Sequence, residues 1–172
     1  VRLVGSEMCK ETGIRPNLAD HFEELAIKRD SFSVIVGALA PYIKFMMKNG
    51  LDFCILELDK SALKVDELKI FTQEETTDAI KAVDNLAITG VTLPKDTLEE
   101  ILSLKKSGAD VIVVGPTVRI QKALFDSCVS CAGSVYTTCA AEFLGVIVQA
   151  GLGYHFRQIC GEIRDKLRES GF

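Results

Sequence analysis

Three short stretches of this chain are apolar at nearly every position, and each runs directly into a glycine. They are Ser33–Val36 with Gly37, Leu86–Thr89 with Gly90, and Val111–Val114 with Gly115. Because apolar and polar residues do not alternate in them, we expect β-strands that are covered by helices on both faces, as in a parallel sheet. The three glycine turns are then predicted to lie together at the carboxyl edge of that sheet, which is where open α/β folds bind ligands.

The segments between these strands carry helix start and stop signals, including two capping boxes, Thr72 with Glu75 and Asp96 with Glu99. The predicted helices are 17–28, 41–49, one that begins at Thr72, one from Asp96 to Ser107, 119–126, 139–150 and 154–169; the two further strands are 53–58 and 133–136. This order predicts an α/β domain over residues 31–172, with a mostly parallel sheet of about five strands. Residues 1–30 are predicted to form a linker and a helix.

Composition narrows the class of protein. The chain has 172 residues, of which 48% are hydrophobic and 26% charged, and its net charge is −4. A chain of this length buries roughly 70% of its unfolded surface in one core, and the charge balance predicts no nucleic-acid partner. The apolar run Phe143–Leu152 is far shorter than the roughly 20 residues of a membrane-spanning helix, so we expect no membrane partner. The chain begins with Val and shows no leader peptide, which suggests a processed or incompletely covered start in a cytoplasmic protein.

The glycine turns and the residues beside them are the predicted ligand site: Gly37, Ala38, Glu57, Thr89, Gly90, Thr92, Gly115, Pro116 and Thr117. A glycine lets the backbone bend sharply, and the amides of a following helix start attract anions. Glu57 lies 20 residues after Gly37, the distance at which dinucleotide-binding domains place the acid that binds a ribose. The full fingerprint needs three glycines, and this turn has one. The alternative is that the glycines only make tight connections.

Six cysteines offer a second kind of site. Cys128 and Cys131 have Cys-x-x-Cys spacing, and Cys139 follows at a predicted helix start, where a thiol's pKa falls. Three thiolates suit zinc, cuprous ion or an iron–sulfur cluster, with a fourth ligand from elsewhere, so a transition metal is the candidate cofactor. A structural zinc site normally shows two such pairs, however. Cys131 and Cys139 equally fit small core residues, and Cys128 fits a turn.

No catalytic residue can be assigned. The chain has no Ser-His-Asp set, HExxH motif or phosphate loop, which removes support for a hydrolase or a kinase. Its two histidines, His21 and His155, lie outside the three glycine turns.

Two strings support a resemblance to a known family. Ile88-Thr89-Gly90-Val91-Thr92 leads to Asp96-Thr97-Leu98-Glu99, and Val113-Val114-Gly115-Pro116-Thr117 leads to Leu124-Phe125-Asp126. With these turns, residues 30–152 resemble the putative heavy-metal chelation domains, a family of unknown function. The resemblance implies a Rossmann-like three-layer sandwich, usually preceded by a domain similar to the amino-terminal part of enolase, for which Val1–Arg29 is too short. In that family the position of Cys128 is commonly Gly and that of Cys131 apolar.

Two functional hypotheses follow. In the first, the protein is a binding module that holds a small ligand, a metal or a metal-bearing molecule at the carboxyl edge. In the second, the same edge binds a nucleotide-like cofactor of a small-molecule enzyme. Free amides and an acid would mark the cofactor site, whereas converging sulfur or nitrogen atoms would mark the metal site. The apolar helix predicted over 139–150 also suggests a homo-oligomer, although burial within one chain would explain it equally well.

Overall fold

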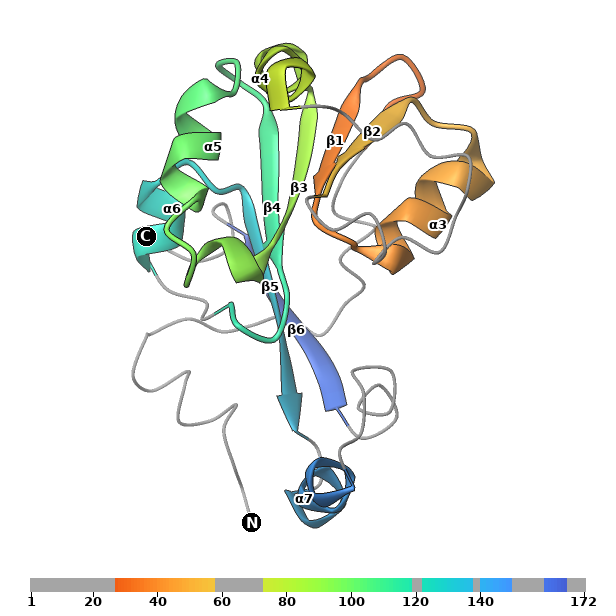
Figure 1. The fold of residues 1–172 in the computed structure, drawn as a ribbon, viewed down its shortest axis with the longest axis vertical. Coiled ribbons are helices and arrows are strands. Elements are labelled where there is room, and N and C mark those ends of the chain that lie inside the picture. Colours follow the sequence, from red (N-terminus) through yellow and green to blue (C-terminus); the bar gives the residue numbers. More distant parts are fainter. Residues whose placement is uncertain (1–26, 58–72, 119–121, 138–139, 150–159, 167–172) are drawn as a thin grey trace.

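The protein is described here by a computed structural model that covers residues 27–57, 73–118, 122–137, 140–149 and 160–166. Its elements, in chain order, are β1 (Ser33–Val36), α3 (Ala40–Asn49), β2 (Phe53–Leu56), α4 (Gln73–Ala82), β3 (Asn85–Thr89), the 3-10 turn η2 (Gly90–Thr92), α5 (Leu98–Leu104), β4 (Asp110–Val114), α6 (Lys122–Asp126), β5 (Cys131–Thr137), α7 (Ala140–Val148) and β6 (Cys160–Lys166). Figure 1 shows one sheet that runs through the molecule, with helices on both sides.

The strands form one sheet in the order β2-β1-β3-β4-β5-β6. The first five strands in this order are parallel, and β6 is antiparallel to β5. The α/β class and the mostly parallel sheet are therefore confirmed, and β6 adds one antiparallel strand at the edge.

Two apolar clusters lie on the two faces of this sheet, as the unbroken apolar strands predict. One cluster joins alternate strand residues such as Val34 and Leu86 to buried side chains of α4, α5 and α6. The other joins Ile35 and Ile112 to α3, through residues that include Met46. In Figure 1, α3 lies on the right of the sheet, and α5 and α6 lie on its left. This is the predicted three-layer arrangement.

The helix predicted over 154–169 is wrong where the structure describes it, because Cys160–Lys166 is the strand β6. All seven residues pair with β5, from Thr137 opposite Cys160 to Cys131 opposite Lys166. An unpaired edge of β5 would leave backbone N–H and C=O groups without partners, and β6 supplies them. The pairing therefore overrides a local pattern that favoured a helix.

The capping box predicted at Asp96 is also wrong. Asp96 has a φ of +60° and is exposed, whereas α5 begins one residue after Thr97 with no side-chain cap. The N–H of Thr97 instead donates to the carbonyl of Thr92 at 3.1 Å, so the preceding 3-10 turn fixes the entry into the helix. The predicted helix end at Gly50 is confirmed, because this left-handed residue donates to the last turn of α3.

The helix predicted over 17–28 lies outside the described residues, apart from Ile27 and Lys28, which are not helical. The helix predicted over 119–126 is present from Lys122, and residues 119–121 lie outside the described part.

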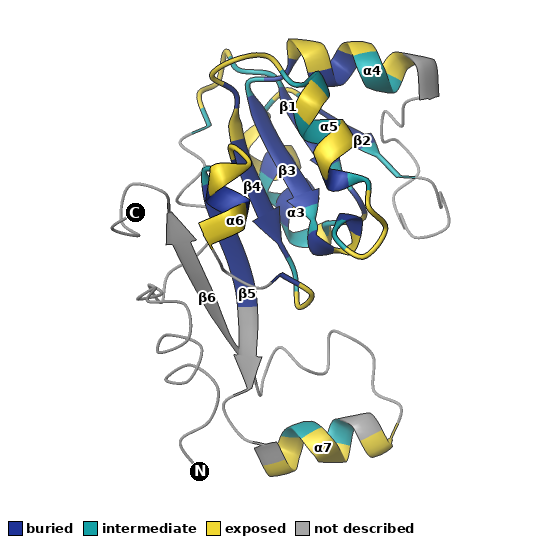
Figure 2. Ribbon diagram, turned by 90° about the vertical axis from the view of Figure 1, so that its left-hand side faces the viewer, coloured by how far each residue is buried: buried dark blue, intermediate teal, exposed yellow. Residues whose placement is uncertain are grey.

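Strand β5 continues well past the carboxyl edge of the parallel sheet. Only its first three residues, Cys131–Gly133, pair with β4, whereas Tyr136 and Thr137 pair with β6 alone. The far end of this hairpin carries α7, which Figure 2 shows well away from the buried strands. Two apolar residues of α7 are largely exposed, Leu144 at 59% and Val148 at 84%. Among the described ranges, no helix has the length and apolar character that crossing a membrane requires.

Candidate ligand site at the carboxyl edge of the sheet

The three glycine turns lie at one edge of the sheet, as predicted. In the register of the parallel strands, Val36 is opposite Ile88, and Thr89 is opposite Val114. Each of these strands therefore ends at about the same level and passes directly into its glycine.

This edge contains the point at which the order of the strands reverses. From β1 the chain moves outward to β2, and it then returns to the other side of β1 for β3, β4 and β5. The two strands that flank the reversal are β1 and β3, which lead into Gly37 and Gly90. In open α/β sheets the crevice outside the carboxyl ends of two such strands is the usual place of a ligand.

The glycines bring neighbouring turns into contact. A Cβ atom on Gly37 would lie 2.6 Å from Cγ2 of Thr89, and one on Gly90 would lie 2.6 Å from Oγ1 of Thr117. Gly37 also has a φ of +95° and Gly115 one of +143°, which side-chain-bearing residues rarely adopt. The interpretation of the glycines as tight connections therefore fits their packing, and it leaves the outer side of the turns available.

Most backbone amides of the first turn are already used within the protein. The N–H of Gly37 donates to Leu56 O at 2.9 Å, that of Leu39 to Gly37 O at 2.8 Å, and that of Ala40 to Ala38 O at 2.9 Å. Since Pro41 has no N–H, the start of α3 offers no row of amides to an anion.

The turn after β4 has the same character. The N–H of Gly115 donates to Gly133 O at 3.1 Å, that of Val118 donates to Gly115 O at 3.1 Å, and Pro116 has none. In the turn after β3, the buried side chain of Thr92 forms a hydrogen bond within the turn: its hydroxyl donates to Thr89 O at 2.9 Å. Thr92 therefore stabilises the turn, although it was a candidate ligand contact.

The remaining candidates present side chains at this edge. Ala38, Pro116 and Thr117 are exposed, whereas Glu57 and Thr89 are half-buried. Glu57 directly follows Leu56, the residue whose carbonyl accepts the Gly37 N–H, so it stands beside the first glycine turn. Sequence reasoning missed one residue here, Val91, which is 44% exposed between Gly90 and Thr92.

The cysteines are not at this edge. Cys54 and Cys131 are buried in β2 and β5, on opposite faces of the sheet. Cys128 is exposed and has a φ of +64°. Its N–H donates to Phe125 O at 3.1 Å, and the next N–H, of Val129, donates to Leu124 O at 3.3 Å. This is the Schellman ending of a helix, and Cys128 occupies the position that usually holds a left-handed glycine.

Of the predicted cysteine trio, the structure describes Cys128 and Cys131. Cys131 lies in the α3-side cluster, whereas α6 and Val129, which flank Cys128, contact the other cluster. Cys139 lies outside the described residues. Among the residues that the structure describes, no three His, Cys, Asp or Glu side chains are placed to hold a metal ion.

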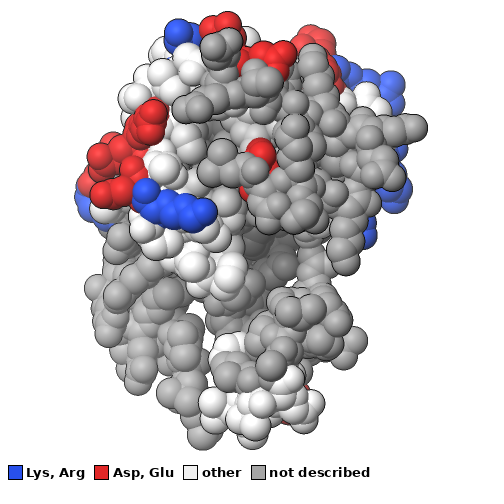
Figure 3. All heavy atoms as spheres, viewed as in Figure 1, with Lys and Arg blue, Asp and Glu red and all other residues white. Residues whose placement is uncertain are grey.

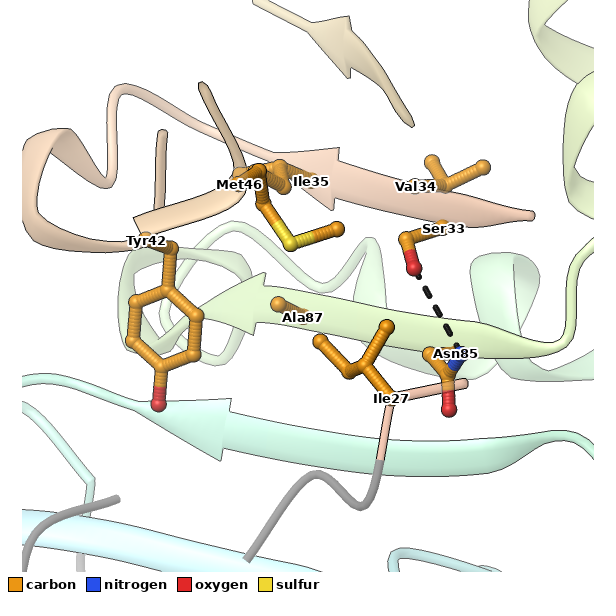
Figure 4. Close-up of a pocket in the computed structure, with 8 residues that line it drawn as sticks. All are labelled: Ile27, Ser33, Val34, Ile35, Tyr42, Met46, Asn85 and Ala87. Carbon is orange, nitrogen blue, oxygen red and sulfur yellow. Dashed lines mark hydrogen bonds between the residues drawn. The ribbon is translucent and has the colours of Figure 1, made fainter. Parts of the chain in front are cut away.

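The cavity in Figure 4 is not at the glycine edge either. It is lined by eight residues, including Ser33 and Asn85 at the amino ends of β1 and β3, with Tyr42 and Met46 of α3. Its volume of about 10 Å³ holds one water molecule at most, which excludes it as a ligand site. The side-chain amide of Asn85 donates to the hydroxyls of Ser31, at 3.0 Å, and Ser33, at 3.4 Å. These hydrogen bonds join the start of β3 to the start of β1.

The amino edge of the sheet carries the strongest electrostatic feature. One carboxylate oxygen of Asp84 accepts the N–H of Phe32 at 2.8 Å, and the other is paired with Lys106. These contacts, that of Lys106 first, hold the pKa of Asp84 below its usual range. Other acidic groups lie on α5, where Glu99 and Glu100 are exposed in the first turn. Figure 3 shows acidic side chains gathered at the left of this face. The Asp84–Lys106 pair lies at the opposite edge of the sheet from the glycine turns.

Comparison with known proteins supplies the family. A family model described as "Putative heavy-metal chelation" matches residues 20–165. Two solved structures from this family, both of unknown function, are similar to the chain at 17% identity. The one from Pyrococcus horikoshii has a TM-score of 0.74, and the match covers 88% of this chain and 60% of that protein's chain. The one from Desulfitobacterium hafniense has a TM-score of 0.72, and the match covers 94% of this chain and 62% of that protein's chain.

This chain thus spans about three-fifths of the length of each of these relatives. No curated protein matches it. At 17% identity the two structures show a shared fold, and the family model covers most of the chain. The protein therefore belongs to DUF364, a family whose function is unknown and whose description suggests the chelation of heavy metals.

Proposed function

We propose that the protein is a binding module that holds a small molecule, or a small molecule that carries a metal, at the carboxyl edge of its sheet. The observation that carries this proposal is the strand order, which reverses between β1 and β3 where the Gly37 and Gly90 turns lie side by side. The family description adds metal chelation as a general suggestion.

The side chains at this edge favour a ligand that brings its own metal ligands. Glu57 and Thr117 offer oxygen atoms, whereas the described thiols lie elsewhere, in β2, in β5 and after α6. Soft heavy metals prefer sulfur, so such a metal would need a chelating molecule to stay at this edge. Metal binding by Cys128, Cys131 and Cys139 remains a separate proposal, which elemental analysis of the purified protein tests.

A second candidate function is that of an enzyme with a nucleotide-like cofactor at the same edge. The position of Glu57, beside the first glycine turn, favours it, because a carboxylate there can accept the hydroxyls of a ribose. Against it, the amides of Gly37, Leu39 and Ala40 are used internally, so a phosphate group would find few donors in this turn.

The test is a set of titrations of the full chain, followed by ¹H–¹⁵N NMR, with AMP, zinc ion and the zinc complex of 1,10-phenanthroline as probes. We expect at least one probe to shift the amide signals of Gly37, Gly90 and Thr117 together. Substitution of exposed Thr117 by Arg, which fills the edge without altering the core, should then weaken that probe's binding. If every probe that binds shifts only residues elsewhere, or if none binds, the proposed site is wrong.

A further proposal concerns self-association. The exposed residues Leu144 and Val148 are four positions apart and so lie on one face of α7. An identical helix would cover both of them, and Glu142, the single charge of α7, would lie at opposite ends of an antiparallel pair. This supports a weak homodimer through α7.

A further inference from the structure

Helix α7 contains a glycine that packing within one copy does not explain. Gly145 lies in the middle of the helix, which continues through it, because the N–H of Gln149 donates to Gly145 O at 3.2 Å. A Cβ atom on Gly145 would meet nothing within 4 Å in the part of the chain that the structure describes. Glycine is the weakest helix former apart from proline, so alanine would both fit here and favour the helix.

This glycine lies at the centre of the exposed face of α7. Successive residues of a helix are turned by about 100°, so Ala141, Gly145 and Val148 share one face. All three are exposed, whereas Phe143 and Val146, on the opposite side of the helix, are half-buried. The exposed face therefore has a shallow centre, made by the smallest residue of the chain.

The two flanks of this face differ in character. One flank carries Leu144 and Val148, which are apolar and largely exposed. The other carries Glu142 and Gln149, which are polar and exposed and lie two helical turns apart. Within one residue, Gly145 is the midpoint of both pairs along the helix.

This symmetry makes the face complementary to itself. Suppose that two copies of α7 are antiparallel and related by a two-fold axis at this midpoint. Leu144 of each copy then lies beside Val148 of the other, on the apolar flank. Glu142 of each copy lies beside Gln149 of the other, where the amide can donate to the carboxylate. A parallel pair would instead place the apolar flank of one helix against the polar flank of the other.

We infer that α7 binds α7 of a second copy in an antiparallel crossing centred on Gly145. This inference rests on the self-association proposed above and adds its orientation and its point of closest approach. The distance between two packed helices is set by the side chains at their contact. With no Cβ at the crossing, the two backbones approach closely, which gives the glycine its reason.

A lipid surface is the other kind of partner that covers an apolar helix face, and α7 suits it poorly. Helices that lie in such a surface carry Lys or Arg on their polar flank, whereas α7 has neither and carries Glu142 there. A lipid surface also gains more from a large apolar residue than from a glycine at the centre of the face. A second copy accounts for both features.

The first test measures the dimer dissociation constant of the full chain by sedimentation equilibrium. Gly145→Leu should raise this constant about tenfold, because the new side chain holds the two backbones apart. Gly145→Ala should raise it less, while the melting temperature of the protein rises, since alanine favours the helix. Ser103→Leu is the control: it adds the same side chain at an exposed position of α5, far from α7 in Figure 1, and should leave the constant unchanged.

The second test reverses a charge opposite Glu142. Gln149→Lys should lower the dimer dissociation constant about threefold at low salt, and Gln149→Glu should raise it about threefold, since each acts on Glu142 of the other copy. Ser103→Lys and Ser103→Glu change the net charge equally and should have smaller effects. High salt should reduce the difference between the two Gln149 variants.

Four results would overturn the inference. A wild type that stays monomeric removes the self-association as well. If wild type dimerises and Gly145→Leu dimerises as tightly or more tightly, the helices do not cross at the glycine, and self-association alone stands. If the Gln149 variants behave as the Ser103 variants do, the antiparallel arrangement is wrong. If monomers bind phosphatidylcholine vesicles and Leu144→Gln abolishes this binding, the face meets lipid instead.

Discussion

The two edges of the parallel sheet are built in different ways. At the amino edge, side chains complete the backbone: Asp84 accepts the Phe32 N–H, and the hydroxyl of Ser130 accepts the Val111 N–H at 3.2 Å. At the carboxyl edge, backbone packs on neighbouring turns through Gly37, Gly90 and Gly115. The first arrangement uses polar side chains for stability, whereas the second leaves Ala38, Pro116 and Thr117 exposed.

The largest expected effect comes from adding one methyl group to the carboxyl edge. Gly37→Ala should lower the free energy of unfolding by about 3 kcal/mol, because the new Cβ meets Thr89 and the positive φ disfavours alanine. Urea denaturation measures this. Gly50→Ala is the control: its φ is +61° but its surroundings are open, so it should cost about 1 kcal/mol.

A double variant separates contact from backbone strain. Thr89→Ser removes the atom closest to the new methyl group, so it should restore about 1 kcal/mol in the Gly37→Ala background. If Gly37→Ala costs no more than Gly50→Ala, the two turns are not held together by this contact.

A smaller and opposite effect is expected at the turn that enters the amino edge of β5. Cys128→Gly should raise the free energy of unfolding by about 1 kcal/mol, because glycine adopts the left-handed conformation of this position without strain. Cys128→Ser should be nearly neutral in stability. Elemental analysis of both variants should show the wild-type metal content; a loss of bound metal in both would make Cys128 a ligand instead.

The amino edge also predicts a dependence on pH. The pKa of Asp84 is lowered in the folded protein, so its contribution to stability is present above the unfolded pKa, near about 4. This contribution to stability is lost as the pH falls through the lower pKa that Asp84 has in the folded protein. Wild type should therefore be more stable than Asp84→Asn at neutral pH, and the difference should shrink in acid. Because Asp84 and Lys106 are partly exposed, high salt should also reduce it. A difference that stays constant from neutral to acid pH would contradict the ion pair.

The smallest effect on folding is expected far from both edges. Leu144→Gln on α7 should change the free energy of unfolding by less than about 0.5 kcal/mol, because the side chain is 59% exposed. Sedimentation at increasing concentration should nevertheless show less association than in wild type. Equal association of the two proteins would remove α7 as the contact between copies.

The parallel part of the fold could be predicted because its signals are local. Val111–Val114 is apolar throughout, and its burial on both faces follows from that fact alone. The common edge of the glycine turns then follows from the geometry of parallel strands. Val91 was missed because exposure at one turn position becomes informative only when three turns are seen side by side.

The antiparallel edge could not be predicted in the same way. β6 exists because β5 pairs with it along seven residues, a contact between segments about 30 positions apart that no local pattern encodes. The Cys-x-x-Cys spacing likewise does not reveal that Cys131 is buried on the α3 side of the sheet, whereas Cys128 is exposed at the end of α6. The capping box at Asp96 failed because a 3-10 turn already determined where α5 begins.

The continuation of β5 beyond its parallel neighbours has a consequence for how the chain can be altered. The segment between Thr137 and Cys160 starts and ends at two paired residues, so its two ends lie a single strand spacing apart. A segment with adjacent ends can be lengthened, shortened or exchanged without stretching the strands that hold it. The hairpin end is therefore a natural point for grafting a reporter or a foreign domain, and the glycine turns would be left unchanged by such a graft.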